Sequence, residues 1–362
     1  MSDSNICFTY GEGIEYALEK LSIPSDRRSS FNHDAQIIKN AFIEAMADSD
    51  PIFRKAFRGM SFARSYMDGI KIDLPEEFDM FVVIRLSCCA LKPILVPNRT
   101  GFIFLSASGS LHPCVRQFGN EGRFVSRLAM RSWLFRHITA VMPRLQRIRC
   151  SRRHIYDLEY TSHDNGVGHT LLAIDHNDTR RRISFDFVPV FEFQASQWIP
   201  GLKIPKNSER NWIAVPRKYF KEHSDEQDER SFMLVVPSWE QLVLHKKQNL
   251  KDSLRLMLAL RDAQEMGALV IYFLKIIYLY KVQGNSINWN QAPGRILIRM
   301  LVILQHSLVG KRLPIFPNHF EKISEETRRD YIRIINRMLR QLIRCRNADC
   351  LTDDDLFDIF GV

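Results

Sequence analysis

The sequence predicts an α+β protein of two lobes, in which a lobe built on a mixed β-sheet precedes an α-helical lobe. The first two hundred residues alternate β-prone apolar runs with turn-rich segments. Beyond the loop 195–231, apolar residues recur at the 3.6-residue spacing of helices that bury one face. At 362 residues, the chain is long enough to bury a large core in two such lobes.

The elements follow in order along the chain. Residues 1–30 join polar pieces to a short amphipathic stretch, so we expect a loosely ordered N-terminal extension. We assign the sheet-containing lobe to residues 31–215, with expected helices over 34–47 and 123–145 and expected strands over 78–86, 94–96, 101–106, 154–160, 167–174 and 182–193. We assign the helical lobe to residues 216–362, with expected helices over 239–266, 269–280, 293–309 and 325–346.

Composition narrows the class of protein. Hydrophobic residues make up 45% of the chain and charged residues 25%, as in ordinary globular proteins. The longest apolar run, 267–280, is broken by Lys275, and the N-terminus shows no secretory pattern. We therefore expect a cytoplasmic protein with no membrane partner. Seven scattered cysteines, an odd number, favour free thiols in a reducing compartment over a disulfide framework.

The net charge of +10 and a pI near 9.3 favour polyanionic partners such as nucleic acid. Basic residues concentrate in three segments, 39–58, 123–153 and 203–221. A groove built from such surfaces would bind a phosphate backbone without reading its sequence. Scattered, solvated charge is the alternative, and the sequence leaves it open.

Three carboxylates suggest a metal site. Glu77 and Asp79 begin a predicted strand two residues apart, so both side chains point to one face, where their repulsion would be relieved by Mg²⁺. Asp186 lies inside another apolar strand, where a lone acid is costly unless it is paired or binds a cation. Three carboxylates from neighbouring strands suit a two-metal site for displacement at phosphorus. The alternatives are two solvated acids at a strand entrance and an Asp186 paired with one of Arg180–Arg182.

These residues resemble a known family. Arg64-Ser65, followed by Glu77-Phe78-Asp79, resembles the Gly-Ser…Glu-x-Asp signature of nucleotidyltransferases, in the version of cyclic GMP–AMP synthase-like receptors and the Mab developmental proteins. Further matches follow in order at Ser184–Pro189, Trp212–Arg217, Pro237–Gln241, Leu254–Met257 and Tyr272 with Lys275, so that the resemblance covers residues 35–362.

The resemblance implies the bilobal nucleotidyltransferase fold and a role in innate immunity. It implies synthesis of a cyclic dinucleotide second messenger from ATP and GTP, with two Mg²⁺ or Mn²⁺ ions. By the same resemblance, Glu77, Asp79 and Asp186 would be the metal ligands and catalytic residues, and Asp186 would assist deprotonation of the attacking hydroxyl.

The resemblance also implies nucleotide-binding residues. Ser65, together with Arg64, would hold the triphosphate, while Glu240, Tyr272 and Lys275 would contact the nucleotide, with the tyrosine ring stacked on a purine. Each has a plainer alternative: a helix cap for Ser65, a core position for Tyr272, and a surface ion pair for Glu240 or Lys275.

Several positions depart from the family pattern and favour a second interpretation. Arginine replaces the glycine that allows close backbone approach to phosphate. Apolar residues replace polar contacts to the nucleotide at Met233, Val235, Leu258 and Ile271. The alternative function is therefore a catalytically degenerate Mab-type interaction protein that keeps the fold. A third possibility is a constitutive nucleotidyltransferase that extends an RNA end.

The family's zinc loop is missing after His245, so we expect no zinc. Zinc-less relatives include sensors of double-stranded RNA, and A-form duplexes are recognised chiefly by shape. Double-stranded RNA is thus favoured over DNA as the activating ligand. The product bases, the linkage and the oligomeric state, including assembly on the ligand, stay open.

Overall fold

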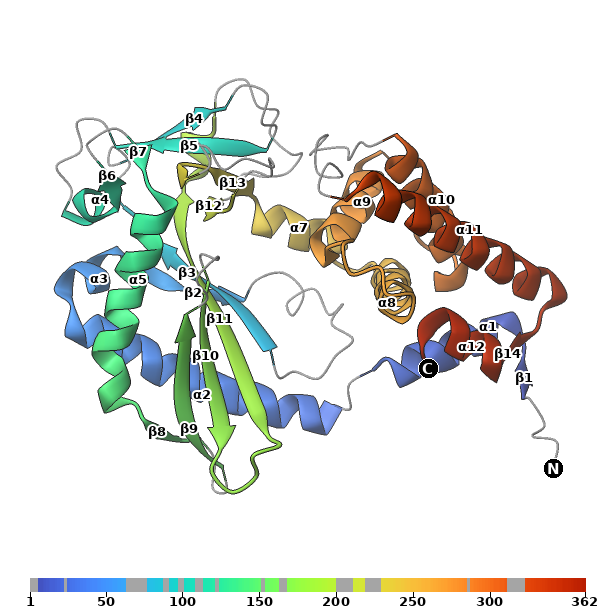
Figure 1. The fold of residues 1–362 in the computed structure, drawn as a ribbon, viewed down its shortest axis with the longest axis horizontal. Helices are drawn as coiled ribbons and strands as arrows, with labels where there is room; N and C mark the ends of the chain where they lie inside the picture. The colour runs from blue at the N-terminus through green and yellow to red at the C-terminus, as the bar shows by residue number, and fades with distance from the viewer. Residues whose placement is uncertain are drawn as a thin grey trace. The chain divides into compact units, whose positions relative to one another are not determined.

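A computed structural model shows how the chain folds (Figure 1). It describes residues 6–22, 25–62, 77–86, 91–96, 101–107, 113–120, 124–150, 154–162, 168–199, 211–218, 229–284, 287–310 and 323–362. These residues divide into two compact units, one formed by 6–22 and 240–362 and the other by 25–62 and 77–239. The predicted α+β class, with a mixed sheet and a helical C-terminal region, is confirmed.

The second of these units, here called the sheet unit, is built on a 12-stranded sheet. The main path runs β6-β7-β5-β13-β12-β11-β10-β9-β8, with β3 joined to β11 and β2, and β4 joined to β5. Among the described strand pairs, β3 and β11 alone run parallel. The strands are β2 (Phe57–Phe62), β3 (Glu77–Ile84), β4 (Lys92–Leu95), β5 (Phe102–Ser106), β6 (Gly119–Asn120), β7 (Phe124–Val125), β8 (Arg147–Arg149), β9 (Ile155–Ser162), β10 (His169–Asp175), β11 (Arg182–Phe193), β12 (Trp212–Pro216) and β13 (Phe232–Val235).

Helices cover the apolar face of this sheet. They are α2 (Ser25–Ser49), α3 (Pro51–Ala56), α4 (Pro113–Phe118) and α5 (Arg127–Val141), followed by the short turns η1 (Met142–Arg144) and η2 (Ala195–Gln197). Phe42 of α2 stacks on Phe187 of β11 with ring centroids 5.2 Å apart, and Phe53 of α3 stacks on Trp133 of α5 at 5.5 Å. Burial of these large rings supplies much of the driving force for the layer.

A buried polar cluster fixes α2 against the sheet. Asp34 of α2 accepts hydrogen bonds from the Tyr156 hydroxyl at 2.9 Å and from Arg181 Nη2 at 2.7 Å. Burial raises the pKa of Tyr156, so the hydroxyl keeps the proton that it donates. A charged pair of this kind is tolerated inside a protein because each member satisfies the other.

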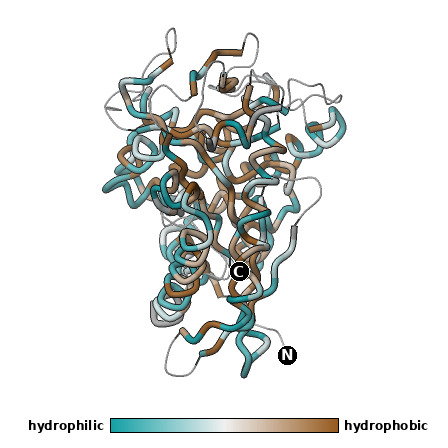
Figure 2. Tube along the Cα trace, turned by 90° about the vertical axis from the view of Figure 1, so that its left-hand side faces the viewer, coloured by the Kyte–Doolittle hydropathy of each residue, from teal (hydrophilic) through white to brown (hydrophobic). Residues whose placement is uncertain are grey.

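The other unit, here called the helical unit, consists mainly of packed helices. They are α1 (Tyr10–Lys20), α7 (Pro237–Leu244), α8 (Gln248–Ala263), α9 (Ile271–Gln283), α10 (Pro293–Val309), α11 (Glu325–Ala348) and α12 (Asp353–Phe360). Only residues 240–244 of α7 belong to this unit. Along the chain as a whole, hydrophobic and hydrophilic residues alternate over short distances (Figure 2), as expected where helices and strands bury one face. The described helices include none long and apolar enough to cross a bilayer.

The N-terminal residues differ from the loosely ordered extension that the sequence predicts. Residues 10–20 form helix α1, whose first turn is closed by a capping box between Thr9 and Glu12, and α2 already begins at residue 25. Tyr10, Ile14 and Ala17 are buried in the helical unit. The amphipathic stretch is thus ordered because its apolar face finds partners near the other end of the chain.

The boundary between the units also differs from the predicted 215/216 division. Strand β13 follows that division, yet it pairs with both β12 and β5. The sheet therefore continues past residue 216, and the change of unit falls between Trp239 and Glu240.

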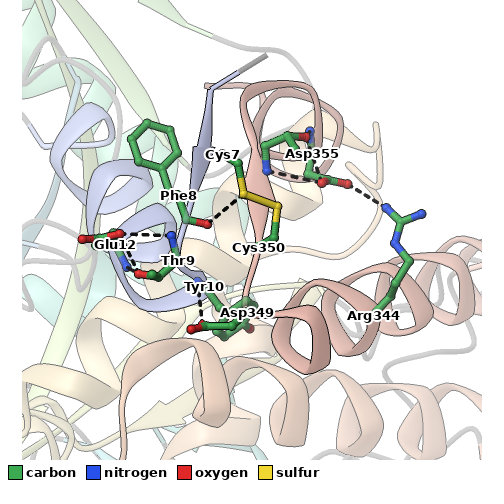
Figure 3. Close-up of a disulfide and its surroundings, with 10 residues drawn as sticks. Cys7, Phe8, Thr9, Tyr10, Glu12, Arg344, Asp349, Cys350 and Asp355 are labelled. Carbon is green, nitrogen blue, oxygen red and sulfur yellow. Dashed lines mark hydrogen bonds and ion pairs between the residues drawn. A yellow bond between two sulfur atoms is a disulfide. The ribbon is translucent and has the colours of Figure 1, made fainter. Parts of the chain in front are cut away.

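Two cysteines correct the expectation of free thiols. Cys7 in strand β1 (Cys7–Phe8) and Cys350, next to strand β14 (Leu351–Thr352), form a disulfide with their Cα atoms 5.8 Å apart (Figure 3). The two short strands pair antiparallel, which brings cysteines 343 residues apart into reach. Cys150 and Cys345 are free and buried.

Candidate active site

The parallel pairing of β3 with β11 brings two of the predicted site residues together. Its register places Asp186 opposite Asp79 and Ser184 opposite Glu77. Because side chains alternate along a strand, Glu77, Asp79 and Asp186 belong to the same face of the sheet. On that face Glu77 and Asp79 are exposed, and Asp186 is partly buried.

Apolar packing on the opposite face of the sheet explains why β3 and β11 keep this register. Phe78 and Phe185 are fully buried there and stack with ring centroids 5.6 Å apart. A slip of one residue would turn these rings toward solvent and the carboxylates toward the core. The apolar packing on one face therefore fixes the acidic residues on the other.

Strand β10 supplies a residue that sequence reasoning missed. Thr170 lies opposite Asp186 in the antiparallel pairing of β10 with β11, and its Oγ1 donates a hydrogen bond to Asp186 Oδ1 at 2.5 Å. Arg181, one of the partners considered for Asp186, instead pairs with Asp34. The turn-rich residues 175–181 were a signal for a hairpin that would bring Thr170 beside Asp186.

The carboxylates fit a divalent cation in type and in strand position. Hard cations such as Mg²⁺ take oxygen ligands, and adjacent acidic residues repel one another without one. As the side chains lie, however, the described residues contain no group of three or more His, Cys, Asp or Glu placed to hold one metal ion. The backbone gathers Glu77, Asp79 and Asp186, and the side chains would have to turn toward one another to share a cation.

The structure describes three of the five predicted nucleotide-binding residues, all of them in the helical unit. Arg64 and Ser65 lie outside the described residues. In the helical unit, Glu240 of α7 and Lys275 of α9 form an ion pair with Lys275 Nζ 2.8 Å from Glu240 Oε2, and their side chains are only 3% and 2% exposed. The sequence offered a surface ion pair as the alternative; this pair is buried. Tyr272 of α9 is partly buried.

The positions that depart from the family pattern are mostly in the core. Met233, Val235 and Leu258 are each only 2% exposed, whereas Ile271 is exposed. Three of the four apolar replacements therefore contribute to packing.

Known proteins similar to this chain share most of its length. Residues 66–239 match the family described as the Mab-21 protein nucleotidyltransferase domain. A cyclic GMP-AMP synthase-like receptor from Drosophila eugracilis is 41% identical over 360 residues, covering 98% of this chain and 96% of that protein. A cyclic GMP-AMP synthase-like protein from Drosophila melanogaster is 31% identical over 334 residues, covering 90% and 91%. A cyclic GMP-AMP synthase-like receptor from Aethina tumida is 23% identical over 311 residues, covering 82% of this chain and 77% of that protein.

Proposed function

Since this chain belongs to the cyclic GMP-AMP synthase-like receptor family and carries a Mab-21 nucleotidyltransferase domain, we propose that it joins ATP and GTP into a cyclic dinucleotide second messenger. The observation that supports this most directly is the register of β3 and β11, which sets Asp186 opposite Asp79 and on the same face as Glu77. The acidic face belongs to the region that matches the nucleotidyltransferase domain.

The residues of this face would divide the chemistry between them. Bound Mg²⁺ or Mn²⁺ would supply charge neutralisation at the triphosphate and activation of the sugar hydroxyl. Glu77 and Asp79, both exposed, would present carboxylate oxygens from the first residues of β3. Asp186, oriented by the Thr170 hydroxyl, would accept the proton of the attacking hydroxyl.

The proposal also covers the activating ligand and the cellular compartment of the protein. We place the protein in the cytoplasm, with double-stranded RNA as the ligand and innate immune signalling as its role. Exposed arginines in the segment from α5 to β8 support a phosphate-binding surface, namely Arg136, Arg144, Arg147 and Arg149. Recognition of an A-form duplex by shape needs no side chains matched to base edges.

A product assay tests the catalytic proposal. The full chain is incubated with ATP, GTP, Mg²⁺ or Mn²⁺, and either duplex RNA or duplex DNA, and the nucleotide products are separated. We expect a product with RNA that disappears in the Glu77→Gln, Asp79→Asn double variant. Glu159→Gln, an exposed acid on β9 of the same sheet, serves as the matched control and should keep full activity. Absence of a nucleotide product with every duplex would contradict the proposal.

A second candidate function is the degenerate interaction protein. It is supported by the burial of Met233, Val235 and Leu258, which cannot offer polar contacts to a base. Calorimetry separates the two candidates, because metal-dependent binding of ATP or GTP is expected only of the enzyme. Lengthening of labelled RNA in the product assay would instead indicate an RNA-extending nucleotidyltransferase.

A further inference from the structure

A cavity of about 330 Å³ in the helical unit is lined by three arginines. Arg295, Ile298 and Arg299 line it from the first two turns of α10, Gln291 lines it from just before that helix, and Arg346 lines it from the last turn of α11. Arg295 lies three residues before Ile298 and four before Arg299, so these three side chains share one face of α10. Two neighbouring helices thus direct three positive charges at one small volume.

These arginines differ from others of the same unit in their partners. Six arginines there are each paired with a carboxylate: Arg255, Arg261, Arg328, Arg329, Arg333 and Arg344. Within the described residues, the side chains of Arg295 and Arg299 have no hydrogen-bond or ion-pair partner, and Arg346 donates to the neutral Asn347 Oδ1 at 3.1 Å. The described residues that line the cavity include no acid. Like charges gathered in this way repel one another, and a bound anion would remove that cost.

Tyr10 of α1 is a core residue that interacts electrostatically with two of these arginines, Arg295 and Arg346. Burial raises the pKa of the Tyr10 hydroxyl, and the positive charges of Arg346 and Arg295 oppose that rise. The hydroxyl donates to the Gly294 carbonyl at 3.4 Å. Because Tyr10 is buried against the first turn of α10, the backbone from which Arg295 projects has a packed support.

We propose that this cavity binds a compact polyphosphate anion, held by Arg295, Arg299 and Arg346. Guanidinium groups donate paired hydrogen bonds to phosphate oxygens in a geometry that an ammonium group does not match. Three of them suit an anion with several charges, and the Gln291 amide adds a neutral donor. The cavity is at the small end of the range for ligand sites, which fits two or three linked phosphates.

A concave site also favours a small polyphosphate over the backbone of a duplex. A duplex presents phosphates along an extended line, and proteins meet it with charges spread over a surface. The three arginines here converge on one cavity instead. The site is formed wholly within the helical unit, so it is separate from the carboxylates of the sheet unit and its test does not depend on catalysis.

The test is calorimetry on the full chain carrying Glu77→Gln and Asp79→Asn, in EDTA, so that metal-dependent binding at those acids makes no contribution. Sodium triphosphate is the probe, and inorganic phosphate is the reference. We expect saturable triphosphate binding, at least about tenfold tighter than that of phosphate, because more oxygens meet the guanidinium groups.

Variants assign the binding to this cavity. Arg295→Gln with Arg299→Gln should weaken triphosphate binding by at least about tenfold, and Arg346→Gln should weaken it as well. Arg337→Gln is the matched control, because it removes the same charge from α11 at a residue that lines a different cavity. Its affinity should stay unchanged, and melting temperatures verify that every variant is folded.

Three results would overturn the proposal: no saturable binding of triphosphate, equal weakening by Arg337→Gln, or retained affinity in the Arg295→Gln, Arg299→Gln variant. Duplex RNA is titrated in parallel. If RNA binds through these arginines while triphosphate does not, the cavity belongs to a nucleic-acid surface and the small-ligand assignment is wrong.

Discussion

Lys275 and Glu240 form a salt bridge that is almost wholly removed from solvent. Replacing Lys275 with methionine leaves the Glu240 carboxylate buried without its cation, and we expect the free energy of unfolding to fall by about 3–5 kcal/mol. Urea unfolding measures the change. Arg333→Met, in the exposed pair with Asp330, is the control and should have little effect. The Glu240→Leu, Lys275→Met double variant should recover most of the loss; an equally unstable double variant would contradict this reading.

The adjacent acids Asp79 and Asp186 should make the sheet unit less stable in the absence of metal. Like charges opposite one another in a sheet repel, so Asp79→Asn should raise the free energy of unfolding in EDTA by about 0.5–1 kcal/mol. Added Mn²⁺ should raise the melting temperature of the wild type but not of the variant. Glu159→Gln should respond to Mn²⁺ as the wild type does, and a metal response that survives Asp79→Asn would exclude this residue as a ligand.

Thr170 should act by positioning Asp186. If the proposed reaction holds, Thr170→Val removes the hydroxyl that donates to Asp186 and should lower kcat about tenfold, the worth of one hydrogen bond to a charged group. The KM for ATP should change little, because in the proposed reaction the Thr170 hydroxyl acts through Asp186, the acceptor of the proton of the attacking hydroxyl. Thr170→Ser keeps a hydroxyl and should restore most of the rate; equal losses in both variants would point to packing.

His169 should make stability depend on pH. Desolvation by burial, helped by the nearby charge of Arg131, lowers the pKa of His169 to about 4 from an ordinary value of 6.5. Between these values the unfolded chain binds more protons than the folded protein, so stability is full above pH 6.5 and is lost as the pH falls toward 4. From pH 7 to pH 5 this amounts to about 2 kcal/mol. Urea unfolding of His169→Gln should show a correspondingly smaller loss, and an unchanged loss would assign the effect to other groups.

The Cys7–Cys350 disulfide should stabilise the helical unit. A cross-link between residues so far apart in sequence restricts the unfolded chain strongly, and a contribution of about 3 kcal/mol is typical. Dithiothreitol should therefore lower the melting temperature of the oxidised wild type. Cys7→Ser should match the reduced wild type and should not respond to the reductant. If the wild type does not respond either, the two thiols are not joined in solution.

Much of the fold could be predicted from local patterns. The expected helix 293–309 coincides with α10, and the expected strand 182–193 coincides with β11, because both have strong periodicity and clear ends. The expected helix 239–266 is instead divided into α7 and α8, and Lys246 between them has a positive φ of 55°. No glycine stands at that turn, so the break between the two helices could not be predicted from the residue pattern.

The residue types of the candidate site were easier to predict from the sequence than their arrangement in space. Alternation along each strand placed Glu77 with Asp79, but the pairing that sets Asp186 opposite Asp79 joins strands more than a hundred residues apart. Such registers depend on tertiary packing, here on Phe78 and Phe185, which a local pattern does not reveal. The roles of these acids stay a prediction, as do those of Arg64 and Ser65.

The pairing of β1 with β14 has a consequence for biosynthesis. Residues 6–22 are translated long before residues 248–360, but α1 packs against α8, α10 and α12 from that later segment. Gly13 of α1 packs tightly against Leu351: a Cβ added at Gly13 would lie 2.7 Å from the Leu351 side chain. The sheet unit, by contrast, has all its strands once Trp239 has been translated. The nascent chain must therefore carry the amphipathic helix α1 without its partners until residues 248–360 have been translated, which makes that helix a natural target for chaperones.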